Sequence, residues 1–159
     1  VLIYELNDPM RFNSMTPMLC DDVTKASAFV HERLNYIRAI VVQGSGLHFC
    51  VGANHYHEVS PAARPPLAQM ARMRHEGMRG FTQLRRVGAA VLCAVHGALQ
   101  GGAMSTCFNC DYRVSDLDST FQHGNLPRGV CPAGGYSTTP VFLLGIVNAQ
   151  IMYLCNEVF

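Results

Sequence analysis

Two apolar runs in this chain are each followed by a pair of small residues, and this repetition constrains the fold more than any other feature. Ile37 to Gln43 precedes Gly52-Ala53, and Ala89 to Val95 precedes Gly101-Gly102. Short apolar runs bounded by glycines are typical of buried strands. The second pair leads into a predicted helix from Ala103 to Cys110, whose first N–H groups lack partners within the helix. The two loops could therefore each present one N–H to a single carbonyl oxygen.

The rest of the pattern alternates between strands and helices. We expect strands at Val1–Leu6 and Tyr112–Ser115, an extended stretch at Leu47–Ala53, and helices at Pro17–Asn35, Leu67–Val87 and, as an amphipathic helix, from about Tyr136. Thr16-Pro17 fits an N-cap followed by a first helical residue. The alternation predicts an α/β fold with parallel strands and a binding crevice at their carboxyl ends. Unbroken hydrophobicity in residues 37–43 further predicts a strand covered on both faces.

Composition places the chain among core-rich globular domains. Of its 159 residues, 49% are hydrophobic and only 14% are charged, with a formal net charge of +1. No basic stripe indicates nucleic-acid binding. No apolar run reaches the roughly 18 residues of a membrane span, so we expect none. The length fits one domain, and because the chain starts without Met and ends within a predicted helix, we expect part of a longer polypeptide.

The cysteines favour reduced thiols over a disulfide framework. There are seven, an odd number, and Cys50, Cys93 and Cys155 stand inside apolar runs. This pattern favours a reducing intracellular compartment. Cys107 and Cys110 form a C-x-x-C on a predicted helix without a second ligand pair, so we expect them to pack in the core.

Four ordered segments of the chain together resemble the crotonase superfamily, the enoyl-CoA hydratase/isomerase family. They are Leu6–Asn13, Arg38–Ala53, Val91–Asp111 and Phe121–Gly135. The resemblance implies a crotonase (ClpP-like) α/β fold of repeated ββα units, with two stacked sheets and flanking helices. It further implies that residues 1–159 are one such domain, incomplete at the C-terminus. The helices that cover the site and help build trimers in this family would be absent, and the full-length protein would be a homotrimer or larger.

The resemblance also implies a site for an acyl thioester. The backbone N–H groups of Ala53 and Gly102 would form the oxyanion hole that holds the enolate oxygen. Substrate-binding positions would be Gly52, Asn54, Gly101, Pro132 and Gly134. The substrate would be an acyl-CoA or an acyl-pantetheine thioester on a carrier protein, with no further cofactor. The sequence of residues 123–132 is similar to that of crotonase domains from polyketide-type multienzymes.

The chain departs from the family where the acid/base residues are expected. The two glutamate positions of the hydratases are Ser105 and Asn125, and the usual Asp after Ala53 is Asn54. These residues do not support a two-carboxylate mechanism. His123 is a candidate acid/base because imidazole titrates near neutral pH, or else a loop histidine bonded to backbone. Ser105 and Asn125 could orient a water or bind a carbonyl.

Three functions remain open from the sequence. The first is hydration or dehydration of a 2-enoyl thioester, the second is isomerisation or decarboxylation, and the third is a non-catalytic thioester-binding domain. No metal site is expected, since His55-x-His57 lacks a third ligand at a recognisable spacing. A chain that lacked the last helices would expose an apolar face, which could contact other subunits of a trimer or a partner. Its residues would be Val141, Phe142, Leu144, Ile151 and Leu154.

Overall fold

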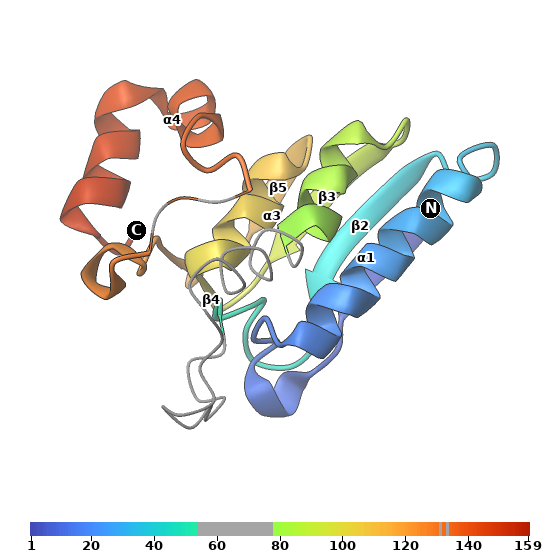
Figure 1. Ribbon diagram of the computed structural model, residues 1–159, viewed down its shortest axis with the longest axis horizontal. Helices are drawn as coiled ribbons and strands as arrows, with labels where there is room; N and C mark the ends of the chain where they lie inside the picture. The colour runs from blue at the N-terminus through green and yellow to red at the C-terminus, as the bar shows by residue number, and fades with distance from the viewer. Residues whose placement is uncertain (54–77, 131, 133) are drawn as a thin grey trace, which may run out of the picture.

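Two parallel sheets form the framework of the protein. A computed structural model describes residues 1–53, 78–130, 132 and 134–159. The larger sheet has four strands in the order β1-β2-β3-β5, and the smaller pairs β4 with β6 (Figure 1). The strands are β1 (Leu2–Leu6), β2 (Ala39–Gly44), β3 (Ala90–Val95), β4 (Ala98–Gln100), β5 (Tyr112–Ser115) and β6 (Thr120–Gln122).

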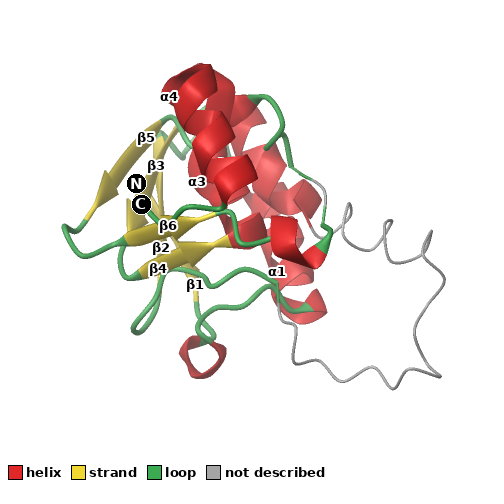
Figure 2. Ribbon diagram, turned by 90° about the vertical axis from the view of Figure 1, so that its left-hand side faces the viewer, coloured by secondary structure: helices red, strands yellow, loops and turns green. Residues whose placement is uncertain are grey.

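The helices gather on one side of these sheets (Figure 2). The longer ones are α1 (Pro17–Glu32), α3 (Met104–Asn109) and α4 (Thr139–Gln150), and residues 78–83 are also helical. Short helical turns are η1 (Pro9–Arg11), η3 (Leu84–Arg86), η4 (Gly101–Ala103), η5 (Leu126–Arg128) and η6 (Ile151–Cys155). The predicted helix at Leu67–Val87 lies outside the described residues up to position 77, and its last part is helical.

The same ββα unit occurs twice in succession. The first unit is β3-β4-α3 and the second is β5-β6-α4. Their strands pair in parallel, with Leu92 opposite Tyr112 in one sheet and Leu99 opposite Phe121 in the other. This repetition confirms the predicted α/β fold and its ββα units. Each unit carries its chain from the large sheet to the small one and then into a helix.

Most predicted boundaries hold, with differences at the helix ends. The Thr16 hydroxyl accepts a bond from the Leu19 N–H at 3.1 Å, so the predicted cap at the start of α1 is confirmed. That helix ends at Glu32 rather than Asn35. The last helix begins at Thr139, and Gly145 breaks it with φ 77° and ψ 161°. The helix predicted from about Tyr136 is thus present, and its interruption at Gly145, where the backbone takes a positive φ, was not predicted.

Two predictions about burial also need correction. β2 alternates between buried and half-buried residues, so only one of its faces is fully covered. The reason is that the described helices lie on one side of the sheet, which leaves Val41 on the other face. Cys50, Cys93, Cys107 and Cys110 are buried as predicted, but Cys155 is exposed at the end of η6. Burial raises the pKa of the Cys50 thiol to about 12, which keeps that thiol protonated.

Candidate active site

The two small-residue loops predicted from the sequence lie side by side. Cys50 and Leu99 form a parallel bridge between them. The Cys50 N–H donates to the Ala98 carbonyl at 3.3 Å, and the Gln100 N–H donates to the Cys50 carbonyl at 3.1 Å. This short ladder fixes the register of one loop against the other.

Ala53 and Gly102 follow the two bridged residues at the same separation along the chain. Ala53 stands three residues after Cys50, and Gly102 stands three residues after Leu99. Gly52 makes the close approach possible, since it adopts φ 84° and a Cβ there would lie 2.6 Å from the Gln100 carbonyl oxygen. A larger residue at position 52 would push the loops apart.

Gly102 lies in the first turn of η4, which leads directly into α3. N–H groups in a first turn have no partner within the helix and are directed toward its positive end. The nearest atoms to a Cβ at Gly102 would belong to methionine side chains, with the Met15 sulfur at 3.2 Å and the Met78 sulfur at 3.4 Å. The peptide is thus backed by apolar groups, which strengthen the electrostatic effect of an N–H donor by excluding water.

The Ser105 side chain stabilises this turn. Its side chain is buried, and its hydroxyl donates to the Gly102 carbonyl at 2.7 Å. Gly134, with φ 63°, passes so close that a Cβ would lie 2.9 Å from the Ser105 hydroxyl. The Asn109 amide then donates to the Ser105 carbonyl at 2.7 Å and to the Gly134 carbonyl at 3.0 Å. These bonds join the first ββα unit to the turn that precedes α4.

Asn125 lies beside the Gly101-Gly102 loop. Its side-chain oxygen is 3.2 Å from the position of a Cβ on Gly101, which has φ 59°. The residue is half-buried, and its amide makes no hydrogen bond to another described side chain or backbone group. The amide is therefore placed beside the Gly101-Gly102 loop.

His123 is buried rather than open to a ligand. Its side chain is 1% exposed, and its ring centroid lies 4.6 Å from the rings of both Tyr136 and Tyr153. Burial lowers the pKa of the imidazole, so the ring is neutral at pH 7. Its Nδ1 atom and the Tyr136 hydroxyl have no hydrogen-bond partner among the described residues. The acid/base role expected for His123 therefore stays a prediction, made for a ring that the described residues bury.

The remaining predicted residues are placed as follows. Asn54, His55 and His57 lie outside the described residues. Pro132 is half-buried, and residues 131 and 133 on either side of it are outside the described part. Within the described ranges no group of three or more His, Cys, Asp or Glu side chains could hold a metal ion. None of the helices described in residues 1–53 and 78–159 is long and apolar enough to cross a membrane.

Asn109 is a structural residue of the site that the sequence reasoning missed. It stands four residues after Ser105 on α3, a spacing that places two side chains on the same helix face. A buried polar residue at that spacing from a predicted site residue was the available signal. Met15 was missed as well, because its contact with Gly102 depends on tertiary structure.

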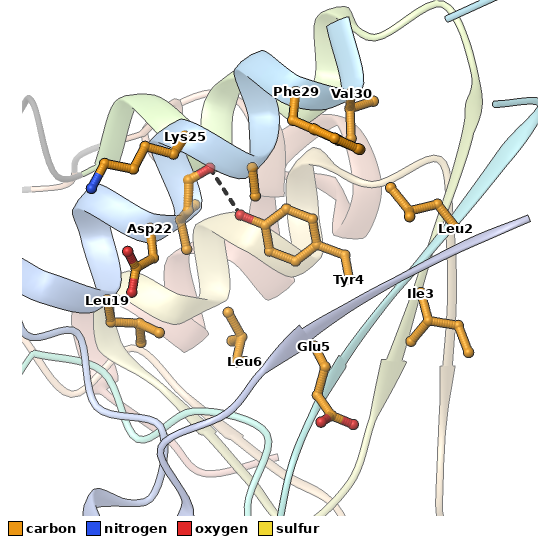
Figure 3. A pocket seen from close by; sticks show the side chains of 12 residues that line it. Leu2, Ile3, Tyr4, Glu5, Leu6, Leu19, Asp22, Lys25, Phe29 and Val30 are labelled. Carbon is orange, nitrogen blue, oxygen red and sulfur yellow. Dashed lines mark hydrogen bonds between the residues drawn. The ribbon is translucent and has the colours of Figure 1, made fainter. Parts of the chain in front are cut away.

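A groove of about 530 Å³ lies elsewhere, between β1 and α1 (Figure 3). Leu19, Val23 and Phe29 contribute to its apolar wall, and the Tyr4 hydroxyl donates to the Val23 carbonyl at 2.9 Å. None of the predicted site residues lines this groove. We therefore assign the candidate site to the two loops and not to this groove.

Comparison with known proteins identifies relatives of the whole described fold. The family model for Enoyl-CoA hydratase/isomerase matches residues 1–159. The chain is 28% identical over 138 residues to Probable enoyl-CoA hydratase echA12 of Mycobacterium leprae, covering 82% of this chain and 45% of that protein. It is 26% identical over 129 residues to the mitochondrial Delta(3,5)-Delta(2,4)-dienoyl-CoA isomerase of Rattus norvegicus, covering 77% of this chain and 39% of that protein.

A solved structure agrees with these sequence matches. The enoyl-CoA hydratase from Polaromonas sp. JS666 superimposes with a TM-score of 0.85 at 25% identity, covering 99% of this chain and 60% of that one. The chain thus spans less than two thirds of the length of each of these three proteins. Since the family model matches every position of the sequence, the chain belongs to the enoyl-CoA hydratase/isomerase family.

Proposed function

We propose that the protein binds an acyl-CoA or acyl-pantetheine thioester and stabilises its enolate through the N–H groups of Ala53 and Gly102. The observation that supports this proposal is the bridge between Cys50 and Leu99, which holds the two loops that carry these residues beside each other. A thioester oxygen gains negative charge as the enolate forms. Two fixed N–H dipoles on one oxygen favour that charge most strongly in the transition state.

The first reaction to test is hydration or dehydration of a 2-enoyl thioester. In hydration the hydroxyl of water bonds to C3 and a proton is added to C2 of the enolate. Relatives named as enoyl-CoA hydratases support this reaction. A structure from Thermobifida fusca in complex with acetoacetyl-CoA supports a thioester of CoA as the ligand class. The Asn125 amide beside Gly101 could hold the attacking water, which gives one proton to solvent as its oxygen bonds to C3, while C2 takes one proton from solvent.

Decarboxylation is the second candidate, and the residues at the two glutamate positions favour it. Ser105 and Asn125 carry no carboxylate, so neither can act as the base that hydration uses in the family. Decarboxylation breaks a carbon–carbon bond, releases carbon dioxide and leaves the electron pair in the same enolate. It therefore requires the oxyanion donors but no protein carboxylate. Double-bond isomerisation, which transfers a proton between carbons, fits this residue set less well.

Mass spectrometry separates these reactions. The protein is incubated with crotonyl-CoA and, separately, with a glutaconyl-type thioester in water. We expect one of two changes: gain of one water by crotonyl-CoA, or loss of carbon dioxide from the second thioester. Retention of both thioesters unchanged on the protein would contradict an enzyme and favour the non-catalytic binding domain.

A matched pair of variants at Gly102 tests the oxyanion donor. Gly102→Pro removes the N–H, whereas Gly102→Ala keeps it and adds a methyl group whose nearest neighbours are the Met15 and Met78 side chains. Proline is tolerated in the first helical turn, so both variants should fold. We expect kcat to fall on the order of 10²–10³-fold in Gly102→Pro and much less in Gly102→Ala. Equal losses of binding and turnover in Gly102→Pro would contradict a transition-state role.

A further inference from the structure

The 123–125 segment, which carries Asn125, is held by its neighbours on two sides. On one side the His123 ring is packed between Tyr136 and Tyr153, with centroid distances of 4.6 Å and interplanar angles of 37° and 56°. Tyr136 belongs to the turn before α4, and Tyr153 belongs to η6. We call these three side chains the aromatic clamp. Three segments far apart in the chain meet in it.

The second attachment is made by the chain after η6. The Asn156 side-chain oxygen accepts the Gly124 N–H at 2.6 Å, and its backbone carbonyl accepts the Gln122 side-chain amide at 3.0 Å. Phe121 and Phe159 exchange two backbone hydrogen bonds of 2.8 and 2.9 Å. The backbone on both sides of His123 is therefore fixed by hydrogen bonds.

The site lies at the other end of this short segment. The His123 carbonyl oxygen is 3.7 Å from the position of a Cβ on Gly101, and the Asn125 side-chain oxygen is 3.2 Å from the same point. A small rotation of the segment would move the Asn125 amide away from the loop that contains Gly102. Displacement of a positioning group by about 1 Å can cost on the order of 10²-fold in rate.

We propose that His123 is a positioning residue whose ring, held in the aromatic clamp, keeps the Asn125 amide beside the Gly101-Gly102 loop. Its function is to fill the space between the two tyrosines, and it transfers no proton. Both ring contacts are tilted contacts with aromatic side chains, and no donor or acceptor among the described residues bonds Nδ1. A flat ring of similar size without nitrogen should serve equally well. This inference rests on the proposed function of the Gly102 loop.

Two substitutions at position 123 distinguish positioning from proton transfer. His123→Phe keeps a flat ring in the clamp but removes both nitrogens, whereas His123→Ala removes the ring. We expect kcat/KM of His123→Phe to stay within about threefold of the parent, with an unchanged pH–rate profile. In His123→Ala we expect a fall on the order of tenfold to a hundredfold, mainly in kcat. A loss of 10² or more in His123→Phe, with an unchanged Tm, would overturn the proposal in favour of an acid/base.

Hydrogen exchange measures the same anchoring without a substrate. We expect the amides of residues 123–125 to exchange faster in His123→Ala and at the parent rate in His123→Phe, because only the first loses the clamp. Unchanged exchange in His123→Ala would overturn the proposal. If the parent protein turns over no thioester, the proposed function fails, and the exchange rates still decide whether the clamp holds the segment.

Discussion

The two ββα units share one topology but bury their helices very differently. All six residues of α3 are buried, and the helix begins at the Gly101-Gly102 turn. In α4 only Thr139, Pro140 and Ala149 are buried. Phe142 of α4 is 87% exposed, whereas Met104 of α3 is 0% exposed.

This difference separates the part of the fold that defines the site from the part that supports it. The Ser105 hydroxyl of α3 donates to the Gly102 carbonyl, so the packing of α3 holds the residue whose N–H is the proposed oxyanion donor. α4 leaves Phe142, Ile146 and Val147 exposed on its surface. Contiguous apolar side chains of this kind are typical of an interaction surface. The predicted open apolar face is thus confirmed for Phe142, Ile151 and Leu154, whereas Val141 and Leu144 are half-buried.

The largest expected effect is a loss of stability, tested by a matched pair of side-chain truncations, one in each helix. Met104→Ala removes a fully buried side chain and should lower the free energy of unfolding by about 2–5 kcal/mol. Phe142→Ala removes an exposed ring and should change it by less than about 0.5 kcal/mol. Urea denaturation measures both. A cost for Phe142→Ala that equals that of Met104→Ala would mean that α4 is covered in solution, and the comparison between the units would fail.

A smaller effect is expected from two asparagines that make the same local bond in the two helices. Asn109 donates to the carbonyl of Ser105 and Asn148 donates to the carbonyl of Leu144, each four residues earlier. Asn109 is buried and also bonds the Gly134 carbonyl, whereas Asn148 is exposed. Asn109→Ala should cost about 1–3 kcal/mol because it leaves buried carbonyls without donors.

Asn148→Ala is the control for that change, since water replaces its bond at no net loss. We expect its unfolding free energy within about 0.5 kcal/mol of the parent. Asn109→Ala should also lower kcat/KM, because the Ser105 and Gly134 segments lose their common donor. Normal activity in a destabilised Asn109→Ala protein would show that this link supports the fold but not the site.

Much of the framework could be predicted from local sequence, and individual strands show why. Tyr112–Ser115 was predicted with its observed bounds, since a short β-rich run between turns has one interpretation. The strands β4 and β6, three residues each, were missed because so short a run carries no period. Their pairing nevertheless forms the second sheet.

Part of the candidate site could likewise be predicted from the sequence, and part could not. The glycines of the two loops could be found in the sequence because close backbone approach requires them, as Gly52 illustrates. The surroundings of His123 could not, because its clamp partners stand 13 and 30 residues further along the chain, at Tyr136 and Tyr153. A polar loop residue gives no local sign that it will be buried. The role of His123 therefore had to be inferred from packing and not from residue type.

The smallest expected effect is a pH dependence that arises from this buried histidine. Burial lowers the pKa of His123 in the folded protein, whereas in the unfolded chain it returns to about 6.5. Below that pH the unfolded chain binds a proton that the folded protein does not, so stability falls as the pH decreases. The contribution is fully present above about pH 6.5 and is lost as the pH falls toward the folded-state pKa. His123→Phe lacks this titration, so its unfolding free energy, measured in urea at about pH 7.5 and at about pH 5.5, should decrease less than that of the parent. Equal decreases in the two proteins would mean that other groups cause the acid sensitivity and that the ring of His123 takes up its proton without leaving the clamp.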